Sequence, residues 1–109
     1  MKTLLITGGS GFIGTNAVHY FANNNWKVIV LDNLSRQGSE GNLSWLKSQQ
    51  GYSIDFLHLN ICDKHAIDKV FNENNIDAVI HLAGQVAVTE SVLDPQKDFE
   101  VNGIGTFNI

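Results

Sequence analysis

Four short apolar runs alternate with longer polar and amphipathic stretches along this chain of 109 residues. Each run is rich in Leu, Ile and Val and is followed by glycine or by a polar residue, which is typical of buried strands in a parallel sheet. The predicted strands are Leu4–Ile6, Val28–Leu31, Ile54–Leu57 and Ala78–Leu82.

The stretches between and after these runs predict helices, because apolar residues recur there at three- and four-residue spacing. The apolar positions are Ile13, Ala17, Val18 and Phe21 in the first helix, Leu43, Trp45 and Leu46 in the second, Ile67, Val70 and Phe71 in the third, and Phe99, Val101, Ile104 and Phe107 in the last. Asn42, Asp63 and Asp94 are the expected N-caps of the later three, the last with Pro95 at its first position.

Alternation of strand and helix predicts an α/β fold with an open, doubly wound parallel sheet, because parallel strands need crossovers to return the chain. The last helical pattern has no stop signal before Ile109. We therefore expect residues 1–109 to be one incomplete domain, the N-terminal part of a larger sheet.

The charge of the chain limits its partners. Seven Lys and Arg residues oppose eleven Asp and Glu residues, for a net charge of −4, and the basic residues are scattered. This pattern disfavours nucleic acids and anionic membranes. Cys62 is the single cysteine, no ligand spacing for a metal is present, and the first apolar run is too short for a signal peptide or membrane span. We expect a cytoplasmic protein.

A glycine-rich turn joins the first predicted strand to the first helix. Gly8, Gly11 and Gly14 are spaced as G-x-x-G-x-x-G, and Gly9 adds G-x-G-x-x-G. In this context the backbone amides and the helix N-terminus would face a pyrophosphate, and Asp32, at the end of the second strand, would accept hydrogen bonds from a ribose. We interpret the turn as a dinucleotide site.

Other interpretations of the turn remain open. A glycine turn can be purely structural. A P-loop would need a lysine, which Phe12-Ile13-Gly14-Thr15 lacks, so ATP or GTP hydrolysis is disfavoured. A methyltransferase, which can also use a glycine turn and an acidic strand end, is a more distant alternative.

The motif Thr7-Gly8-Gly9-Ser10-Gly11-Phe12-Ile13-Gly14 resembles the signature of the extended short-chain dehydrogenases/reductases that act on nucleotide sugars, the NAD-dependent epimerase/dehydratase family. Three further segments extend the resemblance over the whole chain: Asp32–Arg36, His81–Gly84 and Asn102–Thr106. Asn42–Leu46 and His81–Thr89 look most like the family's 2-epimerases, although its hexose 4-epimerases and sugar dehydratases share most of these segments. The resemblance implies a Rossmann-type NAD(P)-binding domain.

The resemblance also implies which residues contact the cofactor. Pyrophosphate contacts are implied at Gly8, Gly11, Phe12, Ile13 and Gly14, and contacts on the adenosine side at Asp32, Asn33, Ser35 and Arg36. Asn60-Ile61 lies where the family usually has Asp-Ile near the adenine, so Asn60 retains hydrogen-bonding capacity but lacks the charge. Contacts beside the second ribose and nicotinamide are implied at Leu82, Ala83, Gly84 and Gln85, with support from Asn102.

Several of these positions have structural interpretations as well. Leu82 and Ala83 can be only a strand end, Asn102 can brace the loop, and Arg36 can be a solvated loop residue that in one interpretation contacts the adenine or a 2′-phosphate. His81 is expected to pack rather than to ligate. Asp32 favours NAD over NADP, because its charge would repel a 2′-phosphate.

No catalytic residue is assigned to this chain. The family's base is a tyrosine in Tyr-x-x-x-Lys, but Tyr20 and Tyr52 are followed four residues later by Asn24 and Phe56. We expect the N-terminal part of an epimerase whose complete form acts on a nucleotide sugar by transient hydride transfer to NAD. This part alone should be inactive. A non-catalytic dinucleotide-binding module is the alternative, and apolar sheet edges would favour self-association into homo-oligomers.

Overall fold

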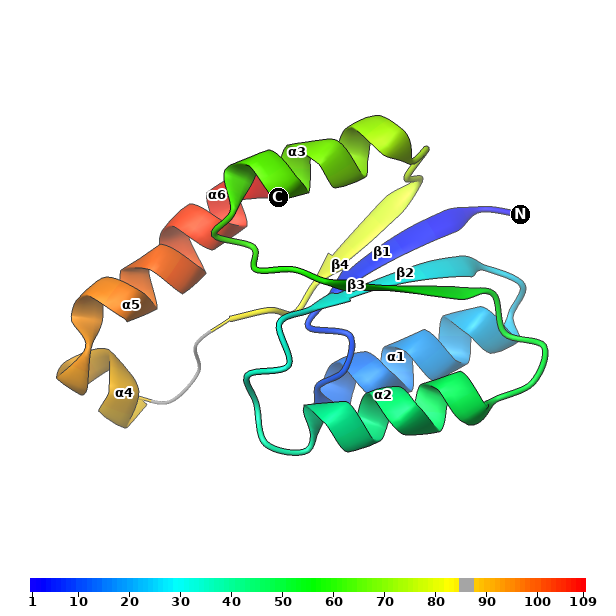
Figure 1. Cartoon of the computed structure of the whole chain (residues 1–109), viewed down its shortest axis with the longest axis horizontal. Helices are drawn as coiled ribbons and strands as arrows, with labels where there is room; N and C mark the ends of the chain where they lie inside the picture. Colours follow the sequence, from blue (N-terminus) through cyan, green and yellow to red (C-terminus); the bar gives the residue numbers. More distant parts are fainter. Residues whose placement is uncertain (85–87) are drawn as a thin grey trace.

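The computed structural model describes residues 1–84 and 88–109 as a parallel sheet between two layers of helices (Figure 1). The sheet has the order β3-β2-β1-β4, and each neighbouring pair is parallel. Its strands are β1 (Thr3–Thr7), β2 (Lys27–Asp32), β3 (Ile54–His58) and β4 (Ala78–His81). The predicted α/β class and doubly wound parallel topology are confirmed.

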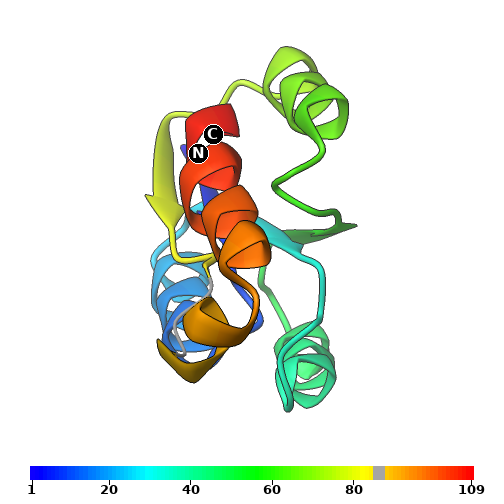
Figure 2. The same cartoon turned by 90° about the vertical axis from the view of Figure 1, so that its left-hand side faces the viewer.

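Helices cover both faces of this sheet. In Figure 1, α1 and α2 lie on one side of the sheet, and α3 lies with the C-terminal helices on the other. The bounds are α1 (Phe12–Asn23), α2 (Ser39–Ser48), α3 (Lys64–Glu73), α4 (Val88–Leu93), α5 (Pro95–Phe99), the π-helical η1 (Glu100–Gly105) and α6 (Thr106–Asn108). Viewed as in Figure 2, the segment α4–α6 lies in front of the carboxyl edge of the sheet.

Two apolar clusters hold the layers together, one on each face of the sheet. Successive residues of a strand point to opposite faces, so the apolar strands β1 and β2 supply both clusters. The cluster under α1 and α2 contains Leu4, Ile6, Val18, Ala22, Val28, Val30 and Leu46. The cluster on the α3 side contains Leu5, Ile29, Leu31, Ile61, Ile67 and Val70.

Two of the predicted helix starts are confirmed by their capping bonds. The Asp63 carboxylate accepts a hydrogen bond from Ala66 N at 3.2 Å, which caps α3. The Asp94 carboxylate accepts one from Lys97 N at 3.0 Å, and Pro95 follows it at the start of α5. Each bond satisfies one of the free amides of a first helical turn.

The prediction that Asn42 caps the second helix is wrong. The helix α2 begins at Ser39 with Gly38 as its N-cap, and Asn42 N already donates to Gly38 O at 3.0 Å. The Asn42 side chain makes a tertiary bond instead, from Nδ2 to Ser10 O at 2.8 Å. This bond ties α2 to the glycine turn.

The predicted inner faces of the first and last helices also need correction. In α1 the prediction is confirmed for Ala17, Val18 and Phe21, which pack against the core, but Ile13 is exposed. The fully buried positions are Gly14, Val18 and Ala22. In the last helical segment Phe99, Ile104 and Phe107 are exposed, and Val101 packs against the core with Ile109. The segment turns π-helical at Glu100–Gly105, which breaks the 3.6-residue register on which the prediction rested.

Among residues 1–84 and 88–109, no helix combines the length and the hydropathy that crossing a bilayer requires.

Candidate functional site

The glycine turn lies at the carboxyl edge of the sheet, directly after β1. Gly8 has a φ of +68°, a left-handed conformation that glycine adopts without a steric penalty. Its amide donates to Leu31 O of β2 at 2.8 Å, and Gly8 O accepts from Gly11 N at 3.1 Å. The turn is thereby attached to the neighbouring strand and folded back on itself.

Close backbone approaches explain the glycines of this turn. A Cβ on Gly14 would lie 2.2 Å from Gly8 O and 2.7 Å from Gly9 Cα. A Cβ on Gly8 would lie 2.8 Å from Ala83 N, in the segment that follows β4. The turn is therefore packed against α1 on one side and against the end of β4 on the other.

The first turn of α1 presents backbone amides without a side-chain cap. Its N-cap is Gly11, which has no side chain to accept from these amides. Phe12 and Ile13 follow with exposed side chains, 81% and 67% accessible, beside the buried Gly14. A helix N-terminus with free amides and the positive end of the helix dipole favours an anion.

Asp32 is held beside this turn by two backbone amides. One carboxylate oxygen accepts from Ser10 N at 3.0 Å and the other from Leu34 N at 2.8 Å. Each oxygen keeps a second lone pair, so the carboxylate can still accept hydrogen bonds from a diol. Ser10 Oγ is buried and has no hydrogen-bond partner among the described residues, which leaves a donor group unused in the turn.

The segment after β2 carries the other predicted adenosine-side residues. Asn33 Oδ1 accepts from Ser35 N at 3.1 Å, and both residues are exposed. Arg36 is exposed as well and lines an open hollow together with Leu34, Ser35, Gln37, Gly38, Glu40 and Gly41. Arg36 therefore lies on the rim of the site, and its contact with a cofactor stays a prediction.

Asn60 and Ile61 follow β3 at the same edge of the sheet. Leu59 N donates to Asp32 O at 3.3 Å, which places Asn60 next to the end of β2. Ile61 is buried and packs against η1, where a Cβ on Gly105 would lie 2.6 Å from Ile61 Cδ1. Ile61 is thus a packing residue in this structure, and Asn60 is exposed.

A hydrogen-bond chain holds the segment that follows β4. Thr7 Oγ1 accepts from Leu82 N at 3.1 Å and from Ala83 N at 3.2 Å, and lies 2.5 Å from His81 Nδ1. With both acceptor sites occupied, the hydroxyl donates its proton to Nδ1. The proton of the imidazole then lies on Nε2.

From Nε2, His81 reaches Thr106 Oγ1 of α6 at 2.9 Å. Burial lowers the pKa of His81 below its ordinary value, in agreement with this neutral tautomer. The chain of bonds joins β1, β4 and α6, and confirms that His81 has a structural role. Sequence reasoning assigned no role to Thr7 or Thr106, because their bonds join residues far apart in the chain.

Asn102 braces the same segment from η1. Its Oδ1 lies 3.1 Å from the position that a Cβ on Gly84 would take, and its Nδ2 donates to Asp98 Oδ1 at 3.2 Å. The predicted contact residue Gln85 lies outside the described residues. Leu82 is partly exposed, and Ala83 and Gly84 are half-buried, with Ala83 packed beside Gly8.

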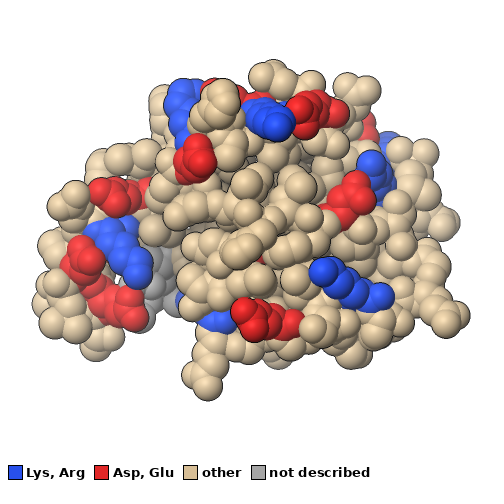
Figure 3. All heavy atoms as spheres, viewed as in Figure 1, with Lys and Arg blue, Asp and Glu red and all other residues tan. Residues whose placement is uncertain are grey.

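On the face in Figure 3 no patch of like charge marks the site, and the described residues supply no set of metal ligands. On the face in Figure 3, acidic and basic side chains are interspersed over the helices. Within residues 1–84 and 88–109, no group of three or more His, Cys, Asp or Glu side chains could hold a metal ion. The binding capacity of the site therefore comes from backbone amides, Asp32 and the polar groups around them.

The strand order and the edge on which the residues meet define the class of protein. The site lies at the carboxyl ends of β1, β2 and β4, where the chain order reverses in a doubly wound sheet, and it carries a glycine turn and an acidic strand end. These are the features of a Rossmann-type dinucleotide-binding domain.

Comparison with known proteins identifies the family. The family model described as GDP-mannose 4,6 dehydratase matches residues 5–109. The CDP-paratose 2-epimerase of Salmonella typhi is 42% identical over 106 residues, which cover 97% of this chain and 31% of that protein. The UDP-glucose 4-epimerase of Bacillus subtilis is 42% identical over 104 residues, with 95% and 30% covered. The chain belongs to the NAD-dependent epimerase/dehydratase family, the extended short-chain dehydrogenases/reductases.

Solved structures agree with this assignment. The Bifidobacterium longum UDP-glucose 4-epimerase in complex with NAD+ and UDP matches with a TM-score of 0.89 at 36% identity, over 98% of this chain and 32% of that one. The Thermus thermophilus UDP-glucose 4-epimerase complex with NAD matches with a TM-score of 0.82 at 37% identity, over 97% and 32%. The chain spans about a third of the length of these relatives.

Proposed function

We propose that this chain is the NAD-binding N-terminal part of a nucleotide-sugar epimerase. The observation that carries the proposal is the uncapped start of α1, packed through Gly14 onto the turn at Gly8 and set beside the Asp32 carboxylate. The solved relatives named above are complexes with NAD, and they share this fold over almost the whole chain.

The residues present fit a dinucleotide. In the proposed arrangement the free amides of Phe12, Ile13 and Gly14 bind the pyrophosphate, and the buried Ser10 hydroxyl is an unused donor nearby. Gly8 and Gly11 line the turn, and their own amides are already bonded within the fold. Asp32 accepts from the adenosine ribose, with Asn33, Ser35 and Arg36 on its outer side. Leu82, Ala83 and Gly84 lie beside the second ribose and nicotinamide, and Asn102 supports them. When bound, NAD supplies the hydride acceptor of a transient oxidation.

The preference for NAD over NADP rests on the same carboxylate. The buried Asp32 carboxylate lies next to the proposed ribose site, where a 2′-phosphate would be repelled. Because both oxygens of Asp32 already accept backbone amides, the side chain cannot turn away to relieve this repulsion.

Isothermal titration with NAD and NADP tests this part of the proposal. The Asp32→Asn variant should bind NAD at least about tenfold more weakly and should discriminate less against NADP, since a charged hydrogen bond is worth roughly 1.5–3 kcal/mol. Asp55→Asn is the matched control, because it removes an exposed carboxylate of β3 that pairs with Lys27. Unchanged NAD affinity in Asp32→Asn would contradict the assignment.

We further propose CDP-paratose 2-epimerase, which acts on CDP-tyvelose, as the activity of the complete protein. The support is the resemblance of Asn42–Leu46 and His81–Thr89 to that enzyme. Residues 85–87 of the second segment lie outside the described residues. The relatives named above include a UDP-glucose 4-epimerase of equal identity, so a UDP-hexose 4-epimerase is the second candidate and a sugar-nucleotide dehydratase the third.

The source reading frame decides between a part of an enzyme and a binding module. If the protein is an epimerase, the reading frame should continue past Ile109 and encode a Ser or Thr and then a Tyr-x-x-x-Lys motif. The complete protein should then interconvert CDP-paratose and CDP-tyvelose but not UDP-glucose and UDP-galactose. The 109-residue chain alone should show no turnover. A stop codon after Ile109, with NAD binding retained, would instead favour the binding module.

A further inference from the structure

Two side chains that flank one segment of the chain hold Ser10, in the middle of the glycine turn. Ser10 N donates to Asp32 Oδ2 at 3.0 Å, and Ser10 O accepts from Asn42 Nδ2 at 2.8 Å. Asp32 ends β2 and Asn42 lies in α2, so the residues between them, 33–41, leave Ser10 and return to it. Both ends of this segment are thereby attached to a single residue of the turn.

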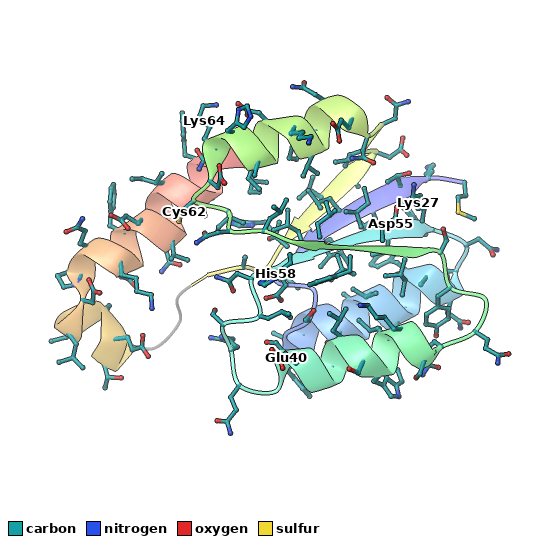
Figure 4. The ribbon with its side chains drawn as sticks, in the orientation of Figure 1. Lys27, Glu40, Asp55, His58, Cys62 and Lys64 are labelled. Atoms are coloured by element: carbon teal, nitrogen blue, oxygen red, sulfur yellow. The ribbon has the colours of Figure 1, made fainter. Side chains whose placement is uncertain are left out.

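The segment 33–41 forms the outer wall of the proposed site. The open hollow described above is lined by residues of this segment, and Glu40, which Figure 4 labels, lies in the first turn of α2 where the loop from β2 ends. Leu34 has a φ of +58°, a left-handed conformation that is unfavourable for a residue with a side chain, and its amide is held by Asp32 Oδ1 at 2.8 Å. A segment with such a residue keeps its shape only where the surrounding contacts fix it.

The bond from Asn42 also fixes the start of α1. The peptide group between Ser10 and Gly11 is bonded on both sides, because Ser10 O accepts from Asn42 and Gly11 N donates to Gly8 O at 3.1 Å. Gly11 is the N-cap of α1 and has no side chain that could fix the helix start. Without the donor of Asn42, the carbonyl side of this peptide loses its partner in α2, and the free amides of α1 are held less firmly in one direction.

We propose that Asn42 is a positioning residue for the dinucleotide, which holds the segment 33–41 against the glycine turn and so fixes both the Asp32 carboxylate and the start of α1. Asn42 acts through Ser10 and is assigned no contact with the cofactor. A site that already has its binding geometry loses less conformational freedom when a ligand binds, so the bond raises affinity. The gain cannot exceed the contribution of one neutral hydrogen bond, which is an affinity factor of at most about tenfold. This inference rests on the proposed NAD site.

The variant Asn42→Ala removes the donor, and Asn74→Ala is its matched control. Asn74 Nδ2 donates to Val70 O at the end of α3, also at 2.8 Å, and both asparagines are half-buried. Alanine favours a helix more than asparagine does, so Asn42→Ala should fold. The measurement is the dissociation constant of the purified protein for NAD, by isothermal titration. It should rise about three- to tenfold in Asn42→Ala and stay unchanged in Asn74→Ala.

This constant separates positioning from a merely structural role. A loss of stability alone does not change the affinity of the molecules that remain folded, so a bond that serves only the fold would leave the dissociation constant unchanged. Hydrogen exchange followed by NMR locates the effect. Relative to the amides of β1, the amides of Ser10 and Gly11 should exchange at least about threefold faster in Asn42→Ala than in the wild type, and no faster in Asn74→Ala.

Three results would overturn the inference while NAD binding by the wild type stands. They are a rise in the dissociation constant of Asn42→Ala below about threefold, an equal rise in Asn74→Ala, and Ser10 and Gly11 amides whose exchange changes no more than that of β1. A wild-type protein that does not bind NAD would instead overturn the proposed function, and this inference with it.

Discussion

Gly14→Ala tests the close approach on which the proposed pyrophosphate site depends. In an exposed helix an added methyl group stabilises by about 1 kcal/mol relative to glycine. At Gly14, however, the new Cβ would lie 2.2 Å from Gly8 O and 2.7 Å from Gly9 Cα, where ordinary contacts begin near 3.4 Å. Both atoms belong to the backbone, so a rotamer change cannot relieve the overlap, and the turn must move away from α1.

The expected magnitude follows from these opposing effects. Overpacking a buried site costs roughly 1–3 kcal/mol, and a clash with backbone lies at the upper end of that range. After the gain in helix propensity, the free energy of unfolding should fall by about 1–2 kcal/mol, which is measured by urea denaturation. NAD affinity should fall at least about tenfold, because a displaced turn no longer presents its amides in the geometry of the wild type.

Gly41→Ala is the matched control for Gly14→Ala. Gly41 also lies inside a helix, α2, but nothing lies within 4 Å of the position its Cβ would take. This variant should therefore be more stable than the wild type by about 0.5–1 kcal/mol and should bind NAD normally. If Gly14→Ala proved as stable as Gly41→Ala and bound NAD like the wild type, the argument from close approach would be refuted.

Two further predictions concern the bonds at the end of β4. Thr7→Val keeps the shape of a fully buried side chain but leaves the amides of Leu82 and Ala83 without the hydroxyl acceptor. Urea denaturation should show that the free energy of unfolding falls by about 1–3 kcal/mol, whereas Thr7→Ser, which keeps the hydroxyl, should largely avoid this loss. Because burial lowers the pKa of His81, the unfolded state binds more protons below about pH 6.5. The contribution of neutral His81 to the free energy of unfolding should be complete above that pH and be lost as the pH falls toward the lowered pKa. The variant His81→Gln should therefore flatten this part of the plot of unfolding free energy against pH. An unchanged profile would refute the assignment to His81.

The sequence could predict those parts of the fold that depend on residues close together along the chain. A glycine turn between an apolar run and a helical stripe involves residues 4–21 only, and the caps at Asp63 and Asp94 bind amides three residues away. The strands of a doubly wound sheet are apolar on both faces, so their positions are also visible as continuous runs. These elements were predicted with nearly the bounds that the structure has.

The errors occurred where a distant contact or an unusual helix decided the outcome. Asn42 has a good N-cap side chain, but its amide reaches Ser10 O, 32 residues away. The short helix α4 was not predicted. The apolar spacing of the last helix was interpreted with a 3.6-residue period that the π-helical η1 does not follow. The close approach of η1 to Ile61 is made by Gly105, a residue that no apolar pattern marks.

The segment after β4 was interpreted either as a strand end or as a cofactor contact. The same contacts between β1, β4 and the glycine turn account for both interpretations. Thr7 can accept from Leu82 N and Ala83 N only because β1 and β4 are adjacent and end at the same edge. That adjacency also places Ala83 against Gly8, so the turn proposed for the pyrophosphate and the segment proposed for the nicotinamide are one packed unit. A change that loosens the end of β4 should therefore weaken binding at the glycine turn, even though it alters no proposed contact with NAD.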